Sequence, residues 1–314
     1  MITMEWFRVA LSLKGSVAPI VLPRVLLFGS FGFLVSLWHY FYPMQSTFVL
    51  GELAGNVVYN LVLGLLLVFR TNSAHERYWE GRKALGALVF NIRNLARDIQ
   101  LGVPSLDAAD REAKQQALKH LAAFAIATKL HLRQEPIDRQ LESLISESQA
   151  EKLKTSKNCP LEISLWIGEY LQSQFQRDSL QDASRRIDSI RLTNFGQLLN
   201  NLVEGLTSCE RILRTPMPLA YAIYLRRLIL IYCIGIPFYL VNRQEWWTCL
   251  SVAIISFILT GVEQIGNEIE NPFGHDPNDL PVDDICNTIL GNVETAIAYS
   301  PTTLSLPSSL SDMN

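Results

Sequence analysis

Residues 48–70 have the sequence FVLGELAGNVVYNLVLGLLLVFR. The run from Phe48 to Phe69 is mostly apolar, and about 20 such residues are enough for a helix to cross the hydrocarbon core of a bilayer. Arg70 ends the run and is the first of a dense series of charged residues. The segment therefore predicts a transmembrane helix that leaves the membrane at Arg70.

Three further apolar segments have a comparable length, one before this segment and two far behind it. They extend roughly over residues 25–41, 219–241 and 246–262. The chain of 314 residues is 49% hydrophobic and only 18% charged, whereas soluble domains contain roughly 25% charged residues. Its net charge of −3 gives no basic surface for nucleic acid, so we expect no nucleic-acid partner.

The distribution of Lys and Arg predicts the orientation of these four spans. The two short connections between paired spans contain a single basic residue, Arg243, whereas the N-terminal segment and the residues after Arg70 contain many. Because cytoplasmic loops are enriched in Lys and Arg, both termini and the long middle region are predicted to be cytoplasmic.

The resulting fold class is an all-α membrane protein with four transmembrane helices and a helical cytoplasmic domain. Apolar residues at helical spacing predict helices over roughly residues 88–101, 107–133, 161–177 and 183–214. The predicted segments are an N-terminal cytoplasmic segment (1–24), spans 1 and 2 (25–69), a cytoplasmic helical region (70–215), spans 3 and 4 (216–265), a cytoplasmic loop and helix (266–300) and a flexible tail rich in Ser, Thr and Pro (301–314).

Motifs of catalysis and cofactor binding are missing from the sequence. It contains no GxSxG, no Walker lysine, no HExxH and no Rossmann glycine pattern, and its five cysteines are dispersed without a CxxC pair. We therefore expect neither enzymatic activity nor a bound cofactor.

Two stripes of residues at four-residue spacing run along the second span. Glu52, Asn56 and Asn60 form a polar stripe, while Ala54, Val58 and Val62 form a stripe of small apolar side chains. In a straight helix the two stripes lie on nearly opposite faces. Small apolar residues that line an aqueous path form a constriction that can lose its water, and the polar stripe would then contact neighbouring helices.

The third span contains the adjacent pair Arg226 and Arg227. Unpaired charges inside a bilayer are costly, so we expect these side chains to extend to the inner membrane surface. A deeper position would require a partner, for which Glu210 and Glu204 are the candidates.

A highly charged segment follows the second span. Arg77 with Glu80, and Glu80 with Lys83, have the spacing of ion pairs within one helix. The same density of charges also permits a packed ion-pair network where the chain leaves the membrane.

An acidic loop follows the fourth span, with the sequence ENPFGHDPNDLPVDDI over residues 270–285. Clustered carboxylates suit a hard cation such as calcium. Asp, Asn, Pro and Gly are also the residues that turns favour for conformational reasons alone, and the spacing is not that of an EF-hand.

Two of these segments carry a resemblance to a known family. FRTNSAHERYWEGRKALG (residues 69–86) and NPFGHDPNDLP (residues 271–281), set among four spans, resemble the bestrophin family and most closely its bacterial and plant-chloroplast branch. The resemblance implies a homopentamer around one central ion pore, in a plasma or thylakoid membrane. The implied partners are further copies of the chain, monovalent ions and membrane lipid.

The resemblance also implies roles for individual residues. Counting back from Arg70 places the narrow apolar neck of the family's pore at Ala54, Val58 and Val62, with Leu61, Leu65 and Leu66 as alternatives for a shifted register. Counting back from the Pro-Leu pair at residues 218–219 places a second, cytosolic aperture at Ile190. In animal members the acidic loop binds calcium through positions that match Asp276 and Asp279, whereas bacterial members resemble this chain and are thought to work without calcium.

The resemblance is less direct evidence for the charge of the conducted ion. The family association is with monovalent anions, chloride and bicarbonate, and Arg70 and Arg191 would form basic rings in a pentamer. Bacterial bestrophin-like proteins also include sodium and potassium channels, for which Glu52 would form an acidic ring. An acidic ring at Glu52 requires the helix of the second span to bend or to begin after Glu52. We predict an anion channel and keep a monovalent cation channel as the alternative.

Overall fold

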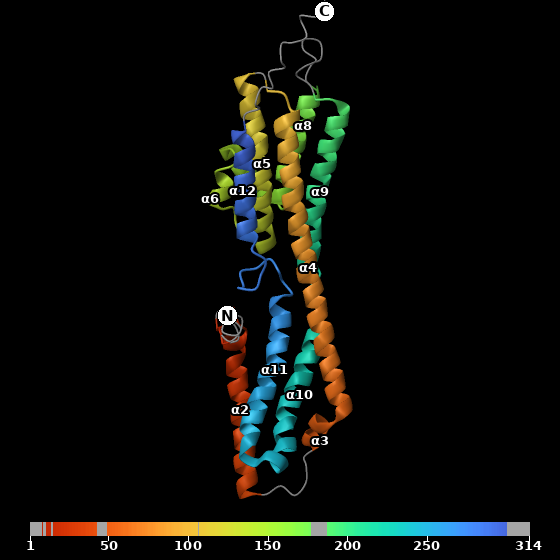
Figure 1. Cartoon of the computed structure of the whole chain (residues 1–314), viewed down its shortest axis with the longest axis vertical. Coiled ribbons are helices and arrows are strands. Elements are labelled where there is room, and N and C mark those ends of the chain that lie inside the picture. The colour runs from red at the N-terminus through yellow and green to blue at the C-terminus, as the bar shows by residue number, and fades with distance from the viewer. Residues whose placement is uncertain are drawn as a thin grey trace, which may run out of the picture. The chain divides into compact units, whose positions relative to one another are not determined.

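The structure, a computed structural model, describes residues 8, 11–13, 15–42, 49–105, 107–176 and 187–299. Every regular element within these ranges is a helix (Figure 1), which agrees with the all-α prediction. The chain divides into two compact units, the first formed by residues 1–83 and 210–280 and the second by residues 84–209 and 281–314. The predicted tail, residues 301–314, lies outside the described residues.

The first unit contains the apolar helices. They are α2 (Ala18–Phe41), α3 (Val49–Gly55), the first part of α4 (Val57–Gly102), α10 (Leu219–Gln244), the short 3-10 helix η2 (Glu245–Trp247) and α11 (Thr248–Glu268). Three continuous stretches, residues 18–41, 57–102 and 219–268, are long and apolar enough to cross a membrane. The last contains α10 and α11, and Figure 1 shows the chain reversing between them at η2. Each of the two is itself of spanning length, with 26 and 21 residues.

The second apolar span is not one helix. α3 ends at Gly55 and α4 begins at Val57, so the break falls at Asn56 and interrupts both predicted stripes. Close packing holds α3 in place, because a Cβ on Gly235 of α10 would lie 2.3 Å from the carbonyl oxygen of Leu50. Small residues allow helix backbones to approach in a membrane, and here only glycine fits.

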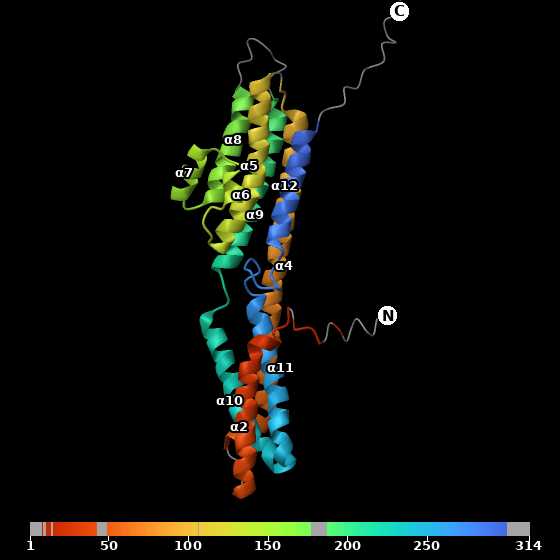
Figure 2. The ribbon, with the colours of Figure 1, turned by 90° about the vertical axis from the view of Figure 1, so that its left-hand side faces the viewer.

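The second unit is built around α5 (Ala108–Arg133), with α6 (Arg139–Glu142), α7 (Glu147–Thr155), α8 (Cys159–Gln176), the end of α4, most of α9 (Ser189–Arg214) and α12 (Val282–Ala298). Figure 2 shows α8 and α12 beside α5, with α7 on the outside. Asp107 caps α5 by accepting a hydrogen bond from the N–H of Asp110 at 2.7 Å. The side chains of α5 from Ala117 to Leu132 are mostly buried.

Salt bridges connect α5 to α12 in this unit. The buried side chains of Lys129 and Arg133 contact the carboxylate of Asp283 at 3.3 and 2.9 Å. Burial alone would raise the pKa of Asp283, but the hydrogen bonds and charges of Arg133 and Lys129 outweigh it and lower this pKa. The contact therefore fixes α12 with an ionised aspartate.

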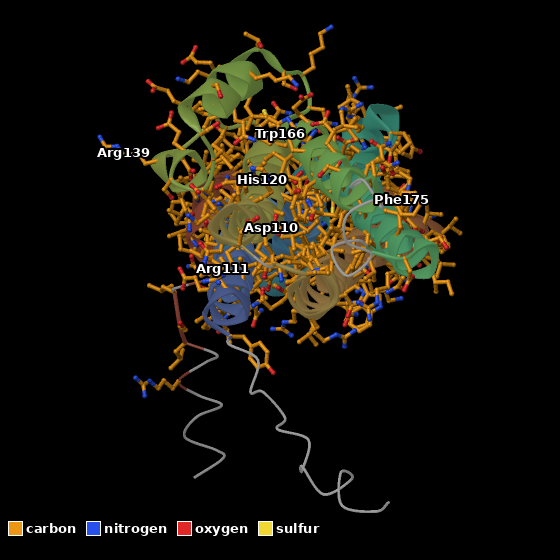
Figure 3. All side chains as sticks on the ribbon, turned by 90° about the horizontal axis from the view of Figure 1, so that it is seen from above. Asp110, Arg111, His120, Arg139, Trp166 and Phe175 are labelled. Carbon is orange, nitrogen blue, oxygen red and sulfur yellow. The ribbon has the colours of Figure 1, made fainter. Side chains whose placement is uncertain are left out.

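His120 is a buried titratable group in the middle of α5. Its Nε2 lies 3.1 Å from Nε2 of Gln116 and 3.2 Å from Nε2 of Gln149, and its ring packs 5.5 Å from Trp166; Figure 3 shows His120 next to Trp166. Nε2 also lies 3.4 Å from Oε1 of Gln149, an acceptor that can bind the protonated ring. Burial lowers the pKa of His120, although the hydrogen bond with Gln149 opposes this.

We expect this histidine to make the second unit less stable in acid. A folded-state pKa below the unfolded value of about 6.5 means that the unfolded chain binds the proton first, so stability falls as the pH drops below about 6.5. His120→Gln keeps an acceptor for Gln116 and should flatten the dependence of the melting temperature on pH between 7 and 5. The exposed His75→Gln is the control, and an equal effect of both variants would contradict the assignment.

Candidate functional site

The break between α3 and α4 is stabilised by the polar stripe of the second span. Oδ1 of Asn56 accepts hydrogen bonds from the N–H groups of Val58 and Tyr59 at 2.8 and 3.3 Å. Nδ2 of Asn60 donates to the carbonyl oxygen of Ala54 at 3.2 Å. The two asparagines thus satisfy backbone groups that the break exposes. That the polar stripe contacts neighbouring helices of the assembly stays a prediction.

Tyr59 connects the start of α4 to α10. Its hydroxyl donates to the carbonyl oxygen of Leu228 at 2.7 Å, and its ring stacks on Tyr232 with the centroids 6.1 Å apart. A buried tyrosine hydroxyl normally finds such a partner. This contact orients the helix that carries the predicted neck residues.

The predicted neck residues differ in exposure within one chain. Ala54 is 2% exposed and belongs to the apolar core with α10, whereas Val58 is 68% and Val62 43% exposed. Of the alternatives, Leu61 is 69% and Leu65 50% exposed. The structure therefore does not bring Ala54 onto the open face that Val58 and Val62 share.

The opposite face of α4 is buried and ends in a charged residue. Leu63 and Leu67 lie in the core of the unit, and Arg70 is 2% exposed. Nη2 of Arg70 contacts the carboxylate of Glu270 at 3.2 Å and Oδ1 of Asn267 at 3.4 Å. Arg70 is thus a buried, paired charge rather than a free basic group in the single chain.

Glu270 has several further partners. Its other carboxylate oxygen accepts a hydrogen bond from the N–H of Met217 at 2.9 Å. Its carbonyl oxygen accepts from Nε of Arg77 at 3.1 Å. Arg77 also donates to the carbonyl oxygens of Ile212 and Thr215, and Arg211 contacts Glu80. The segment after span 2 thus forms a packed network, and the alternative of ion pairs confined to one helix is wrong for Arg77 and Glu80.

The acidic loop is held by its own hydrogen bonds and by α4. Oδ2 of Asp279 accepts from the N–H of Asp276 at 2.7 Å, and the N–H of Leu280 donates to the carbonyl oxygen of Pro272 at 3.0 Å. A Cβ added at Gly81 of α4 would lie 3.1 Å from Pro272 and 3.2 Å from Phe273. The two sequence motifs therefore meet in space.

The described residues form no carboxylate cluster for a calcium ion in this loop. Calcium takes six to eight oxygen ligands, whereas the described part of the chain brings no group of three His, Cys, Asp or Glu residues together. Asp276 is exposed, and Asp279 is engaged by the backbone of the loop.

Ile190 lies in the first turn of α9 and is 81% exposed. Asp188 accepts a hydrogen bond from the N–H of Arg191 at 2.7 Å, and Nη1 of Arg191 donates to the carbonyl oxygen of Gly102 at 2.9 Å. That carbonyl is one of those left without a helical partner at the end of α4. Arg191 thereby fixes the turn that presents Ile190.

Sequence reasoning missed the partner of Arg226. Nε of Arg226 contacts Glu263 of α11 at 2.8 Å, and neither Glu204 nor Glu210 is its partner; Glu210 contacts Arg214 instead. The signal in the sequence is a single carboxylate directly after the apolar run of span 4.

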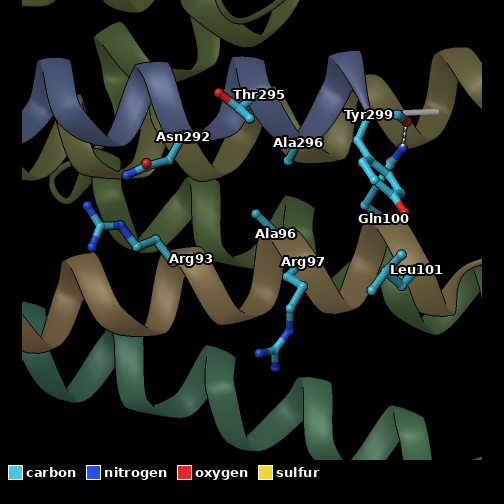
Figure 4. Close-up of a pocket in the computed structure, with 9 residues that line it drawn as sticks. All are labelled: Arg93, Ala96, Arg97, Gln100, Leu101, Asn292, Thr295, Ala296 and Tyr299. Carbon is cyan, nitrogen blue, oxygen red and sulfur yellow. Dashed lines mark hydrogen bonds between the residues drawn. The ribbon is translucent and has the colours of Figure 1, made fainter. Parts of the chain in front are cut away.

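Sequence reasoning also missed a cavity of about 460 Å³ between α4 and α12 of the second unit (Figure 4). Arg93, Asn292 and Tyr299 are among its lining residues, and Gln100 donates to the carbonyl oxygen of Tyr299 at 2.9 Å. None of the predicted site residues lines it.

Comparison with known protein families identifies the family of this chain. Residues 2–295 match the family described as bacterial and fungal bestrophin proteins. The chain belongs to the bestrophin family. The resemblance stated from the two motifs is thereby confirmed, as is the expectation that this bestrophin is not an enzyme.

Individual relatives cover nearly the whole of this bestrophin. A voltage-dependent anion channel-forming protein of Nostoc sp. is 52% identical over 297 residues, which cover 95% of this chain and 93% of the relative. A protein of the same description from Synechocystis sp. is 45% identical and covers 94% of this chain and 93% of its own. The crystal structure of a bacterial bestrophin homolog from Klebsiella pneumoniae has a TM-score of 0.74 at 25% identity, covering 90% of this chain and 99% of that chain. This bestrophin is therefore an all-helical integral membrane protein.

Glu270→Gln is expected to lower the free energy of unfolding by about 3 kcal/mol, because it leaves Arg70 as a buried charge without a carboxylate. Gln keeps the shape of the side chain and an acceptor for the N–H of Met217, so the loss of unfolding free energy reports the missing negative charge. Thermal unfolding in detergent checks it, with the exposed Glu76→Gln as the control. A melting temperature equal to that of the control would show that Glu270 does not stabilise the arginine.

Proposed function

We propose that this bestrophin is a passive anion channel in which five copies surround one central pore. The descriptions of its relatives as voltage-dependent anion channel-forming proteins support this proposal. The observation that carries it is the open apolar face of α4, which lies opposite the face packed into the core. Each copy would contribute this face to the pore, and ions would move down their electrochemical gradient without chemistry.

We place the neck at Val58, Val62 and Leu65. Their spacing of four and three residues puts them on one face of a helix, and all three are exposed in the single chain. Ala54 is left out because it is buried. A ring of apolar side chains favours ions that lose their hydration shell readily, so chloride and other weakly hydrated monovalent anions would pass.

The second constriction of this proposal is Ile190. It is exposed, and the neighbouring Arg191 is held at 2.9 Å from the carbonyl oxygen of Gly102. Five isoleucines with five arginines beside them would form a narrow aperture with a positive potential. Such a ring attracts chloride and bicarbonate.

One observation favours the alternative of a monovalent cation channel. The break at Asn56 separates α3 from the register of α4, which is the condition under which Glu52 can face the pore together with Val58. Glu52 is exposed. A ring of five such carboxylates would concentrate sodium or potassium ions.

The proposal also includes the orientation. The first and last described segments would lie on the cytoplasmic side with the middle region, in a plasma or thylakoid membrane. The positive-inside distribution of Lys and Arg supports this side.

The reversal potential in planar bilayers under a KCl gradient tests the sign of the conducted ion. We expect it to shift toward the equilibrium potential of chloride. A shift toward that of potassium would replace the anion channel by the cation channel, and Glu52→Gln should then reduce the selectivity. A monomer in size measurements of the purified protein would contradict both, since the proposed pore exists only between copies.

Val62→Phe is expected to reduce single-channel conductance or to alter selectivity, because the larger ring narrows the proposed neck. Val68→Phe is the matched control, since Val68 is also exposed on α4 but lies on a different face. If both variants conduct like the native protein, Val62 does not line the pore. A change in conductance or selectivity seen only in Val68→Phe would place the neck on the face of α4 that carries Val68.

A further inference from the structure

Two arginines and one glutamate line a polar pocket among α2, α10 and α11. Nε of Arg226 contacts Oε1 of Glu263 at 2.8 Å, and Nη1 of Arg24 lies 3.7 Å from Oε2 of the same carboxylate. The Glu263 side chain is 6% exposed, while those of the two arginines are about half exposed. The pocket, of about 350 Å³, therefore carries an excess of one positive charge at its open side.

An apolar groove of about 660 Å³ adjoins this pocket between α2 and α10. Phe28 and Leu230 line both. The other groove residues are apolar apart from one serine: Pro23, Leu26, Leu27, Ser30, Phe31, Leu34 and Ile234. Several of them, including Leu27 and Leu34, are more than half exposed.

Along both α10 and α2, an arginine is followed by apolar residues in the same order. On α10, Leu230 and Ile234 follow Arg226 at four-residue spacing, and on α2, Leu27, Phe31 and Leu34 follow Arg24 at spacings of three and four. Such spacing keeps each series on one helix face. Both helices thus present an arginine first and an apolar track after it, which matches a molecule with an anionic head and a long apolar tail.

We propose that this surface binds one anionic phospholipid, with its phosphate at Arg24 and Arg226 and one acyl chain in the groove. Charge complementarity selects this occupant, because the excess positive charge needs an anion and the groove needs hydrocarbon. The membrane around the helices supplies both in one molecule. Under the positive-inside orientation the two arginines lie at the cytoplasmic end of the spans, at the level of the lipid headgroups.

Titration of the delipidated full-length protein in detergent with phosphatidylglycerol and with phosphatidylcholine tests the proposal. We expect phosphatidylglycerol to bind more tightly and to raise the melting temperature more. Arg24→Gln removes one cationic contact, which should weaken phosphatidylglycerol binding about fivefold. Arg24 contributes only the longer contact to Glu263, so the Arg226–Glu263 pair stays in place in this variant.

Arg227→Gln is the matched control. Arg227 is the exposed neighbour of Arg226 on the same helix and lies outside the pocket, so this variant should bind phosphatidylglycerol like the native protein. Equal weakening by Arg24→Gln and Arg227→Gln would overturn the proposal, because it would mean a general effect of net charge. Equal binding of the two lipids would overturn it as well.

Two further measurements separate the lipid from other occupants. Ser30→Phe fills the groove without touching the ion pair and should weaken phosphatidylglycerol binding; unchanged binding would remove the acyl chain from the groove. Inorganic phosphate should not reproduce the thermal shift, and a full reproduction would make the site one for a soluble anion. Disulfide crosslinking of Leu27→Cys between two copies in the native membrane would show that a second copy covers the groove and would overturn the proposal.

Discussion

The buried contact between Arg70 and Glu270 is the constraint on which the first unit depends. A guanidinium that is 2% exposed is tolerated only with a carboxylate beside it. Glu270 satisfies this need and also accepts from the N–H of Met217 and, through its carbonyl, from Arg77. One residue therefore holds the end of the spanning part of α4, the segment before α10 and the acidic loop. The first family motif contains Arg70, and the second begins directly after Glu270.

The same rule of paired polar groups explains the second span. A bilayer offers no water to a broken helix, so every exposed backbone group needs a partner within the protein. Asn56 and Asn60 supply these partners with their side chains, and Tyr59 supplies a hydrogen bond to α10. The polar stripe is therefore a local device that permits a bend. The bend in turn lets α3 pack on Gly235 while α4 presents Val58 and Val62 outward.

Sequence patterns predicted the elements of this fold better than their contacts. The helix expected over residues 107–133 is observed from Ala108 with Asp107 as its cap, because periodicity and capping are local properties. The break at Asn56 was not predicted, since an apolar run of spanning length reads as one helix. Glu263 was missed as the partner of Arg226, because pairing between spans depends on how the helices pack. The burial of Ala54 depends on α10 in the same way.

The exposed face of α4 leads to the argument for several copies. Val58, Leu61, Val62 and Leu65 alone could face lipid, because all are apolar. Asn60 is exposed as well, but it lies nearly opposite Val58 and Val62 on the helix and donates to the carbonyl oxygen of Ala54. A polar side chain that faces lipid is costly, so this side of the segment is expected to meet protein or water. In the proposed assembly of several copies, the valine face would line the pore and the opposite, polar face would contact a neighbouring helix.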